Sequence, residues 1–286
     1  MKKLIVMIFC IGLTIICFIP FIILFVNSTK TINELLAGTT EWAGITNGLL
    51  ASFVPGQNFS NNLNVLLHDV NLSLPRSFIN SFVISASATV LTVYFSSLTA
   101  YAFTTYKFKG SKFLYGFILA VLMVPSQISI VAFIDLMYSF GWTESWRSFL
   151  PLIIPAIASP STVFFMRQYM KSSVSLEMVE AGRIDGSGEF AIFNRLVIPI
   201  ITPGMSTMAI FAMVASWNNL FMPTVLLNGE WRTIPIYVNQ LLGNQFRTEL
   251  GAIYLGLSLT ILPLIVFYLL LSKYIVAGVS LGGVKE

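Results

Sequence analysis

Long runs of apolar residues constrain the fold of this chain more than any other feature of its sequence. About 20 consecutive apolar residues are needed for a helix to cross the hydrocarbon core of a bilayer. The runs here are continuous and do not alternate with polar residues, which favours helices over the strands of a closed barrel. They predict six spans, at residues 4–26, 78–105, 113–138, 149–166, 200–220 and 250–276.

The composition supports the same class. Only 10% of the residues are charged and 56% are hydrophobic, whereas soluble domains carry about 25% charged residues. We therefore predict an all-α integral membrane protein. The net charge of +4 comes from Lys and Arg scattered at the ends of the spans, so it indicates no nucleic-acid partner. No cluster of residues predicts a metal site, and Cys10 and Cys17 are expected to be buried thiols in the first span.

The distribution of positive charge predicts the orientation in the membrane. Of the 16 Lys and Arg residues, 11 fall on one side of the six predicted spans and 5 on the other. Because cations are enriched in cytoplasmic segments, both termini are predicted to be cytoplasmic. Residues 1–77 then form a first span plus an extracellular segment, and residues 78–286 form a transmembrane core. This core includes a cytoplasmic loop at residues 175–196 and a cytoplasmic C-terminal tail.

The polar, glycine-punctuated loop before the fifth span has the features of a docking element. Ser175 is the predicted N-cap of a helix over residues 176–184. Asp185-Gly186 is predicted to be a turn, because glycine accepts a positive φ at little cost. A second short helix is expected from residue 187 or 188 to about 196. Small residues on such a segment would let a cytoplasmic partner approach closely, and the alternative is an ordinary amphipathic loop.

The loop carries Glu180-Ala181-Gly182, then Gly186, and then Leu196, Ile198 and Pro199 at its end. In this order and spacing it resembles the EAA loop of binding-protein-dependent ABC importers. The family pattern is E-A-A, three residues, G, nine residues and then I-x-L-P. Gly182 departs from it by replacing alanine, and Ser175 stands where proline is common. Asp185 before Gly186 is typical of the carbohydrate-importing branch. The residues at the motif positions are Glu180, Ala181, Gly182, Gly186, Leu196, Ile198 and Pro199.

Shorter matches to the carbohydrate-importer permeases extend the resemblance from about residue 78 to the end of the chain. They lie at residues 80–81, 100–102, 108 and 110, 124–127, 217–219 and 274–285. The last of them resembles the tail of the maltose-type second permease subunit. The resemblance implies the transmembrane domain of a type I ABC importer, with six transmembrane helices and a cytoplasmic coupling helix.

The resemblance also implies partners and roles. The partners are a second permease subunit, two cytoplasmic ABC ATPase subunits that bind ATP and Mg²⁺, and an extracellular or periplasmic sugar-binding protein. This chain itself would hold no cofactor, and its tail at residues 277–286 would contact the ATPases. The residues expected to couple it to the ATPase are Glu180, Ala181, Gly182, Asp185, Gly186 and Pro199.

The energy source is expected to lie outside this chain. The sequence has no G-x-x-x-x-G-K-[ST] phosphate loop, so we predict that it is not an enzyme and has no catalytic residues. Energy must then come from another chain or from an ion gradient. Asp135 is the one carboxylate within the predicted spans, near the outer end of the third. This scarcity of intramembrane acids argues against an ion-coupled carrier.

Amide and aromatic side chains in the third and fifth spans are candidates for the substrate pathway. Gln127, Asn218 and Asn219 both donate and accept hydrogen bonds, which suits a hydroxyl-rich ligand. Trp217 offers a flat face for a sugar ring. The same amides can hydrogen-bond between helices, and that alternative stays open.

Together these features predict the permease subunit of an ABC importer for a carbohydrate, with an oligosaccharide favoured, in the cytoplasmic membrane. The alternatives are an ABC importer for another solute such as an amino acid, peptide or phosphate, an ion-coupled secondary carrier, and a membrane anchor or sensor. The sequence does not identify the sugar.

Overall fold

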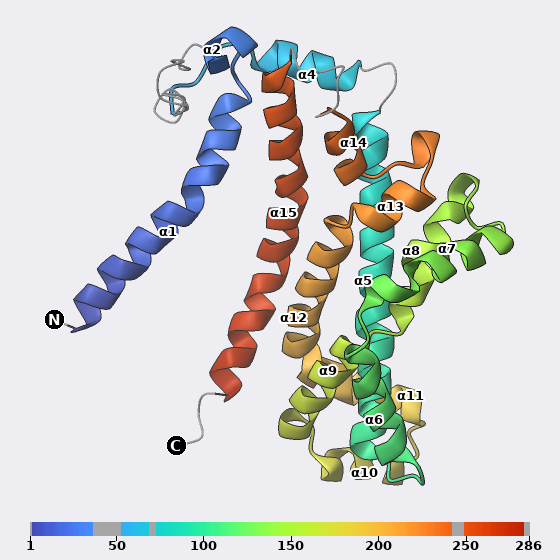
Figure 1. Cartoon of the computed structure of the whole chain (residues 1–286). Coiled ribbons are helices and arrows are strands. Elements are labelled where there is room, and N and C mark those ends of the chain that lie inside the picture. Colours follow the sequence, from blue (N-terminus) through green and yellow to red (C-terminus); the bar gives the residue numbers. More distant parts are fainter. Residues whose placement is uncertain (1, 37–52, 69–72, 242–248, 283–286) are drawn as a thin grey trace. The chain divides into compact units, whose positions relative to one another are not determined.

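A computed structural model of the chain describes residues 2–36, 53–68, 73–241 and 249–282 (Figure 1). The regular structure of these residues is helical, with no strand, which confirms the all-α class. Five of their helical runs are long and apolar enough to cross a membrane. These are α1 (Lys2–Asn27), α5 (Leu74–Thr105), the interrupted run Ser145–Ser173, the run Glu189–Trp217 and α15 (Leu250–Gly282).

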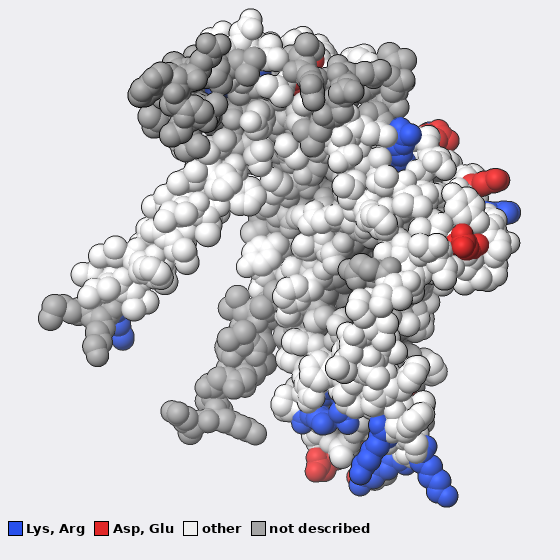
Figure 2. Space-filling view, in the orientation of Figure 1, with Lys and Arg blue, Asp and Glu red and all other residues white. Residues whose placement is uncertain are grey.

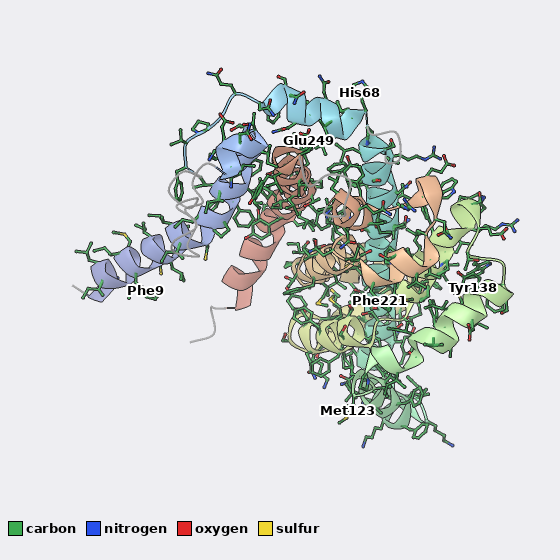
Figure 3. All side chains as sticks on the ribbon, turned by 45° about the horizontal axis from the view of Figure 1, so that its top comes forward. Phe9, His68, Met123, Tyr138, Phe221 and Glu249 are labelled. Carbon is green, nitrogen blue, oxygen red and sulfur yellow. The ribbon has the colours of Figure 1, made fainter. Side chains whose placement is uncertain are left out.

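The region of the third predicted span differs from the single helix expected there. It holds two shorter helices, α6 (Ser111–Leu122) and α7 (Ile130–Ser139), with the 3-10 turn η1 (Ser126–Ser129) between them. Figure 3 shows Met123 at the end of α6 and Tyr138 on α7. Pro125 explains the break, because proline has no N–H to donate and disfavours helical geometry at the residue before it.

By its internal contacts the chain divides into two compact units. Unit 1 comprises Met1–Phe78 and Thr233–Pro263, and unit 2 comprises Ile79–Arg232 and Leu264–Glu286. The predicted division into residues 1–77 and 78–286 is made by membrane side and by role. These units are defined by contacts and do not test it, so it stays a prediction. The predicted contact of residues 277–286 with the ATPase subunits also stays a prediction. The helical backbone of α15 continues to Gly282, and the side chains from residue 274 onward lie outside the described part.

Helix α1, in unit 1, is exposed along its apolar length. None of its most apolar stretch is buried, and both Cys10 and Cys17 are exposed. The expectation that these thiols are buried is therefore wrong for the chain by itself. A helix that is apolar all round is stable in lipid or against other membrane helices.

The rest of unit 1 is held by buried polar contacts and an apolar core. Its short helices are α2 (Ile32–Leu36), α4 (Phe59–Leu67) and α14 (Ile234–Leu241). The Asn62 amide donates to the backbone oxygens of Ser28 at 2.8 Å and Lys30 at 3.0 Å. The Tyr237 hydroxyl donates to the Leu66 oxygen at 3.1 Å. Because buried polar atoms without partners are costly, these bonds fix α4 in place. The buried core residues are Leu66, Leu74, Ile234, Tyr237, Val238, Leu241, Ala252, Ile253 and Leu255.

Unit 2 is organised around α5. Its buried face carries small hydroxyl residues at helical spacing, which allow other helices to approach closely. They are Ser81, Ser85, Thr89, Thr92, Ser96 and Ser97. At the start of α5, the Asn80 amide donates to the backbone oxygens of Glu230 at 2.8 Å and Arg232 at 2.9 Å.

The remaining helices of unit 2 follow α7 along the chain. They are η2 (Ser145–Phe149), α8 (Leu150–Ile153), η3 (Ile154–Ile157), α9 (Pro160–Ser173), α10 (Leu176–Ile184), α11 (Glu189–Ile192), η4 (Phe193–Val197), α12 (Ile198–Trp217), α13 (Phe221–Leu226) and η5 (Gly229–Trp231). Their buried core joins α5, α9, α10 and the run from α11 to α12. Its residues include Ala100, Tyr101, Met166, Met170, Val179, Ile192, Phe193, Val197 and Ile201.

Candidate functional site

The loop predicted to dock a partner begins with a capped helix. Ser175 is the N-cap of α10, and its hydroxyl accepts a hydrogen bond from the Met178 N–H at 3.4 Å. The same hydroxyl donates to the Glu177 carboxylate, which holds the pKa of Glu177 below its usual value. An N-cap bond and an acid in the first turn both stabilise a helix start. The predicted start of this helix at Ser175 is therefore confirmed.

The turn after α10 is also as predicted. Gly186 has a φ of +78°, in the left-handed region. The N–H of Gly186 donates to the Arg183 oxygen at 3.0 Å, and the N–H of Ser187 donates to the Gly182 oxygen at 3.0 Å. This pair of bonds is a Schellman motif, which satisfies the last carbonyls of a helix and needs a residue that tolerates positive φ. Asp185 precedes it as the C-cap, so Asp185 and Gly186 end the helix together.

The second half of the loop differs from the separate helix expected to end near residue 196. Helix α11 begins after Gly188 and passes through the π-helical turn η4 directly into α12. Pro199 lies at the second residue of α12. A proline so placed removes one backbone N–H and crowds the carbonyl four residues earlier, and a wider π turn accommodates this. The loop is thus continuous with the fifth span.

The inner face of α10 packs on the chain's own core. Val179 is fully buried and Gly182 is buried beside it. A Cβ atom on Gly182 would lie 3.1 Å from Leu196 Cδ1 and 3.2 Å from Ile192 Cγ1. The close approach that the sequence analysis assigned to a partner at Gly182 is therefore made, in this structure, by α11 and η4 of the same chain.

The outer face of the loop consists of the exposed residues Glu180, Ala181, Ile184, Asp185 and Gly186. Ile184 stands out because 86% of its surface is exposed, although it is a large apolar residue in a polar segment. Single exposed apolar residues are common on protein surfaces, so Ile184 indicates a contact only together with the motif residues Glu180, Ala181 and Asp185 beside it. The sequence alone does not single out Ile184, because only the packing of Val179 and Gly182 shows which face of α10 is exposed.

A polar network holds α10, α11 and the end of α5 together. Arg183 Nε lies 2.7 Å from Glu189 Oε1, and the Tyr101 hydroxyl donates to Glu189 Oε2 at 2.9 Å. The guanidinium of Arg183 also lies over the ring of Tyr106, with its Cζ 5.1 Å from the ring centroid. The hydrogen bond to Glu189 raises the pKa of Arg183. The sequence alone does not reveal this network, because Tyr101 and Tyr106 lie far from Arg183 and Glu189 in the chain.

The candidate substrate residues lie in different environments. The side chain of Gln127, in η1, lies outside the described part of the chain. Trp217 ends α12 with only 2% of its surface exposed, so it is buried in this structure. Asn218 is exposed and Asn219 is half-buried. Asp135 is exposed on α7.

Asn219 also lines a pocket of about 530 Å³ between α5, α9 and α12. The pocket wall carries several hydroxyl groups, which give a ligand both donors and acceptors. These are Thr92, Ser159, Ser161, Thr162 and Ser216. That Gln127, Trp217, Asn218 and Asn219 line the substrate pathway stays a prediction. The hydroxyl residues of this pocket are further candidates for contacts with the substrate.

Several helices of membrane-spanning length and a capped polar helix before the run Glu189–Trp217 give this chain the form of a membrane transport component. The family described as "Binding-protein-dependent transport system inner membrane component" matches residues 92–281, and the chain belongs to this family. It is therefore a multi-pass membrane permease subunit of an ABC transport system, in which the ATPase is a separate subunit. The alternatives of an ion-coupled carrier and a simple anchor are thereby set aside.

Two individual transport permeases are similar to this chain over most of its length. The chain is 33% identical to the arabinooligosaccharides transport system permease protein AraQ of Halalkalibacterium halodurans, over 84% of this chain and 90% of that protein. It is 28% identical to the melibiose/raffinose/stachyose import permease protein MelC of Bacillus subtilis, over 94% of this chain and 91% of that protein.

A solved structure shows the same fold. A chain of a bacterial ABC transporter involved in the import of the acidic polysaccharide alginate superposes with a TM-score of 0.73 at 22% identity. The match covers 94% of this chain and 95% of that one. The predicted fold of a type I importer transmembrane domain is confirmed. In general terms, such a component works with a partner permease, an ATPase and a substrate-binding protein.

Proposed function

We propose that this chain forms half of the membrane pathway of an ATP-driven importer for an oligosaccharide. The observation that carries the proposal is its similarity, over most of its length, to permeases named for arabinooligosaccharides and for raffinose-type sugars. The hydroxyl-lined pocket beside Asn219 supports it, because hydroxyl and amide groups match a sugar's donors and acceptors. A second permease subunit completes the pathway, and an external sugar-binding protein delivers the substrate.

Uptake measurements test the substrate class. The transporter genes are expressed in cells that lack their own oligosaccharide importers, and uptake of labelled arabinotriose and raffinose is measured. Labelled glutamine, a dipeptide and phosphate serve as controls. Uptake of an oligosaccharide that stops when this chain is deleted supports the proposal. Uptake of only the amino acid, dipeptide or phosphate would overturn it.

The outer face of the loop is proposed to dock on one of two cytoplasmic ATPase subunits. Glu180, Ala181 and Asp185 are exposed there beside the apolar Ile184, while the inner face holds α10 on its own chain. ATP and Mg²⁺ bind in the ATPase subunits, and closure of that pair moves the docked loop. Gly186 and Pro199 shape the segment that moves, at the turn and at the start of α12.

The run from α11 to α12 is proposed to transmit that motion. It is 29 residues long, from Glu189 to Trp217, which corresponds to about 43 Å of helix. One end is fastened to α10 by the Arg183–Glu189 pair. The other end precedes Asn218 and Asn219. A shift of the loop is therefore carried to the pocket by one continuous element.

The orientation of the chain is part of the proposal. Exposed Lys and Arg gather at the end of unit 2 that carries α6 and α10 (Figure 2), and include Lys107, Lys109, Lys112, Lys171 and Arg195. Such a cluster favours the cytoplasmic side, and both termini are proposed to lie on that side. An impermeant thiol reagent applied to intact cells tests this. It should label Asn61→Cys but not Ser187→Cys, and the reverse pattern would refute the orientation.

A further inference from the structure

A second pocket in unit 2 lies at the basic end of the spans, away from the pocket beside Asn219. It has a volume of about 300 Å³ and lies between the start of α6 and the middle of α9. Its described lining residues include two cations and no acid. They are Phe103, Ser111, Lys112, Tyr115, Gly116, Leu119 and Arg167.

Arg167 is held in place in this pocket, and among the described residues no acid pairs with it or with Lys112. The guanidinium of Arg167 stacks on the ring of Tyr115, with its Cζ 3.9 Å from the ring centroid. Stacking of this kind orients the planar guanidinium and leaves its outer N–H groups free to bind an oxyanion. Lys112 adds a second positive charge from the first turn of α6, where the helix dipole is also positive.

Two buried polar atoms at this pocket have no hydrogen-bond partner among the described residues. They are the Tyr115 hydroxyl and Arg167 Nε. A buried donor without an acceptor destabilises the folded state. A ligand oxygen near Tyr115 would supply the acceptor that the chain does not. The pocket thus has the charge and the unmet donors of an anion site.

The surroundings indicate which anion fits. On α6, Phe113 has 76% and Phe117 has 61% of its surface exposed. In a membrane protein, such an apolar helix face lies against acyl chains or against another membrane helix. Leu119 and Phe103 continue the apolar surface into the pocket. An anionic head beside apolar tails is the chemistry of a phospholipid at the boundary of the bilayer, where Lys and Arg meet headgroups.

We propose that this pocket binds the headgroup phosphate of an anionic phospholipid, contacted by Arg167, Lys112 and the Tyr115 hydroxyl. The bound lipid would hold α6 against α9 at the end of unit 2 that also carries α10. The proposal concerns lipid binding alone, so it can fail or succeed independently of the transported substrate.

Lipid binding is measured on the tagged full chain, extracted together with its transporter subunits. Phosphatidylglycerol is titrated in detergent, and bound lipid is counted by native mass spectrometry. Loss of one cation should weaken binding by about fivefold, since a basic residue near an anionic headgroup contributes about a factor of five in affinity. Arg167→Gln and Lys112→Gln should show this loss. Lys109→Gln, an exposed lysine outside the pocket lining, should not.

A variant that fills the pocket distinguishes a defined binding site from non-specific attraction of the lipid to the basic surface. A Cβ atom on Gly116 would meet no atom within 4 Å, so the pocket lining has room for a side chain there, and Gly116→Leu fills it while favouring the helix. It should abolish phosphatidylglycerol binding while both cations remain. Retained binding in Gly116→Leu, or an equal loss in Lys109→Gln, would overturn the proposal. Inorganic phosphate that binds alone and displaces no lipid would also overturn it, by showing a free-phosphate site.

Discussion

The inner and outer faces of the short helix α10 differ in what surrounds them, so substitutions on them should have different effects. The inner face, with Val179 and Gly182, is buried against α11 and η4 of its own chain. The outer face, with Glu180, Ala181 and Ile184, is exposed. Substitutions inside should therefore lower the stability of the folded chain. Substitutions outside should leave stability unchanged and act only on the partner.

The largest effect is expected for Gly182→Val. Its methyl groups would overlap Ile192 and Leu196, whose nearest atoms would lie 3.2 and 3.1 Å from a Cβ atom at this position. Overpacking of this kind costs about 1–3 kcal/mol. We expect a lower melting temperature of the purified chain and loss of uptake. The matched control is Gly182→Ala, which should be tolerated because the side-chain tips of Ile192 and Leu196 can yield slightly. Equal melting temperatures for the two variants would contradict the intramolecular role of Gly182.

The second-largest effect is expected for Gly186→Val. This residue has a φ of +78° and open space around it, so only the backbone opposes a side chain. Left-handed geometry costs an L-residue about 1–2 kcal/mol, more for a β-branched one. We expect uptake to fall while the protein remains in the membrane. Gly188→Val is the control, because Gly188 also has open space but has an extended backbone with a φ of −68°. Normal uptake by Gly186→Val would refute the role of this turn.

A smaller effect is expected for the ion pair that fastens the inner face. Both Arg183 and Glu189 are about one-third exposed, with 34% and 39% of their side-chain surfaces accessible. A pair so exposed contributes about 0.2–1 kcal/mol. Glu189→Gln should lower the melting temperature slightly, and a double-mutant cycle with Arg183→Gln measures the coupling. A coupling energy of zero would show that Tyr101 alone holds Glu189.

The smallest effect on stability is expected for Ile184→Ser. Because 86% of its surface is already exposed, the free energy of unfolding should change by less than about 0.5 kcal/mol. Recovery of the ATPase with the tagged chain should nevertheless fall, together with uptake. Ser187→Ala, an exposed neighbour on the loop, serves as the control. Full ATPase recovery with Ile184→Ser would show that Ile184 is not part of the docking surface.

Local features of this loop could be predicted because their causes lie within a few residues. The hydroxyl of Ser175 caps the helix that starts beside it. The positive φ of Gly186 closes a turn whose bonds reach back only a few residues, to Arg183 and Gly182. The break in the third span has an equally local cause in Pro125, so it too could have been predicted from the sequence.

The sequence alone determined the class of the protein, most of its spans and the family motif, because apolar run length, helix caps and motif spacing are all short-range properties. Only the tertiary structure decided that Gly182 faces its own chain, that Trp217 is buried, and that Tyr101 meets Glu189 across 88 positions in the sequence. Such contacts depend on which helix faces pack together. Many sequences with the same periodicity could pack those faces differently, so no local pattern specifies them.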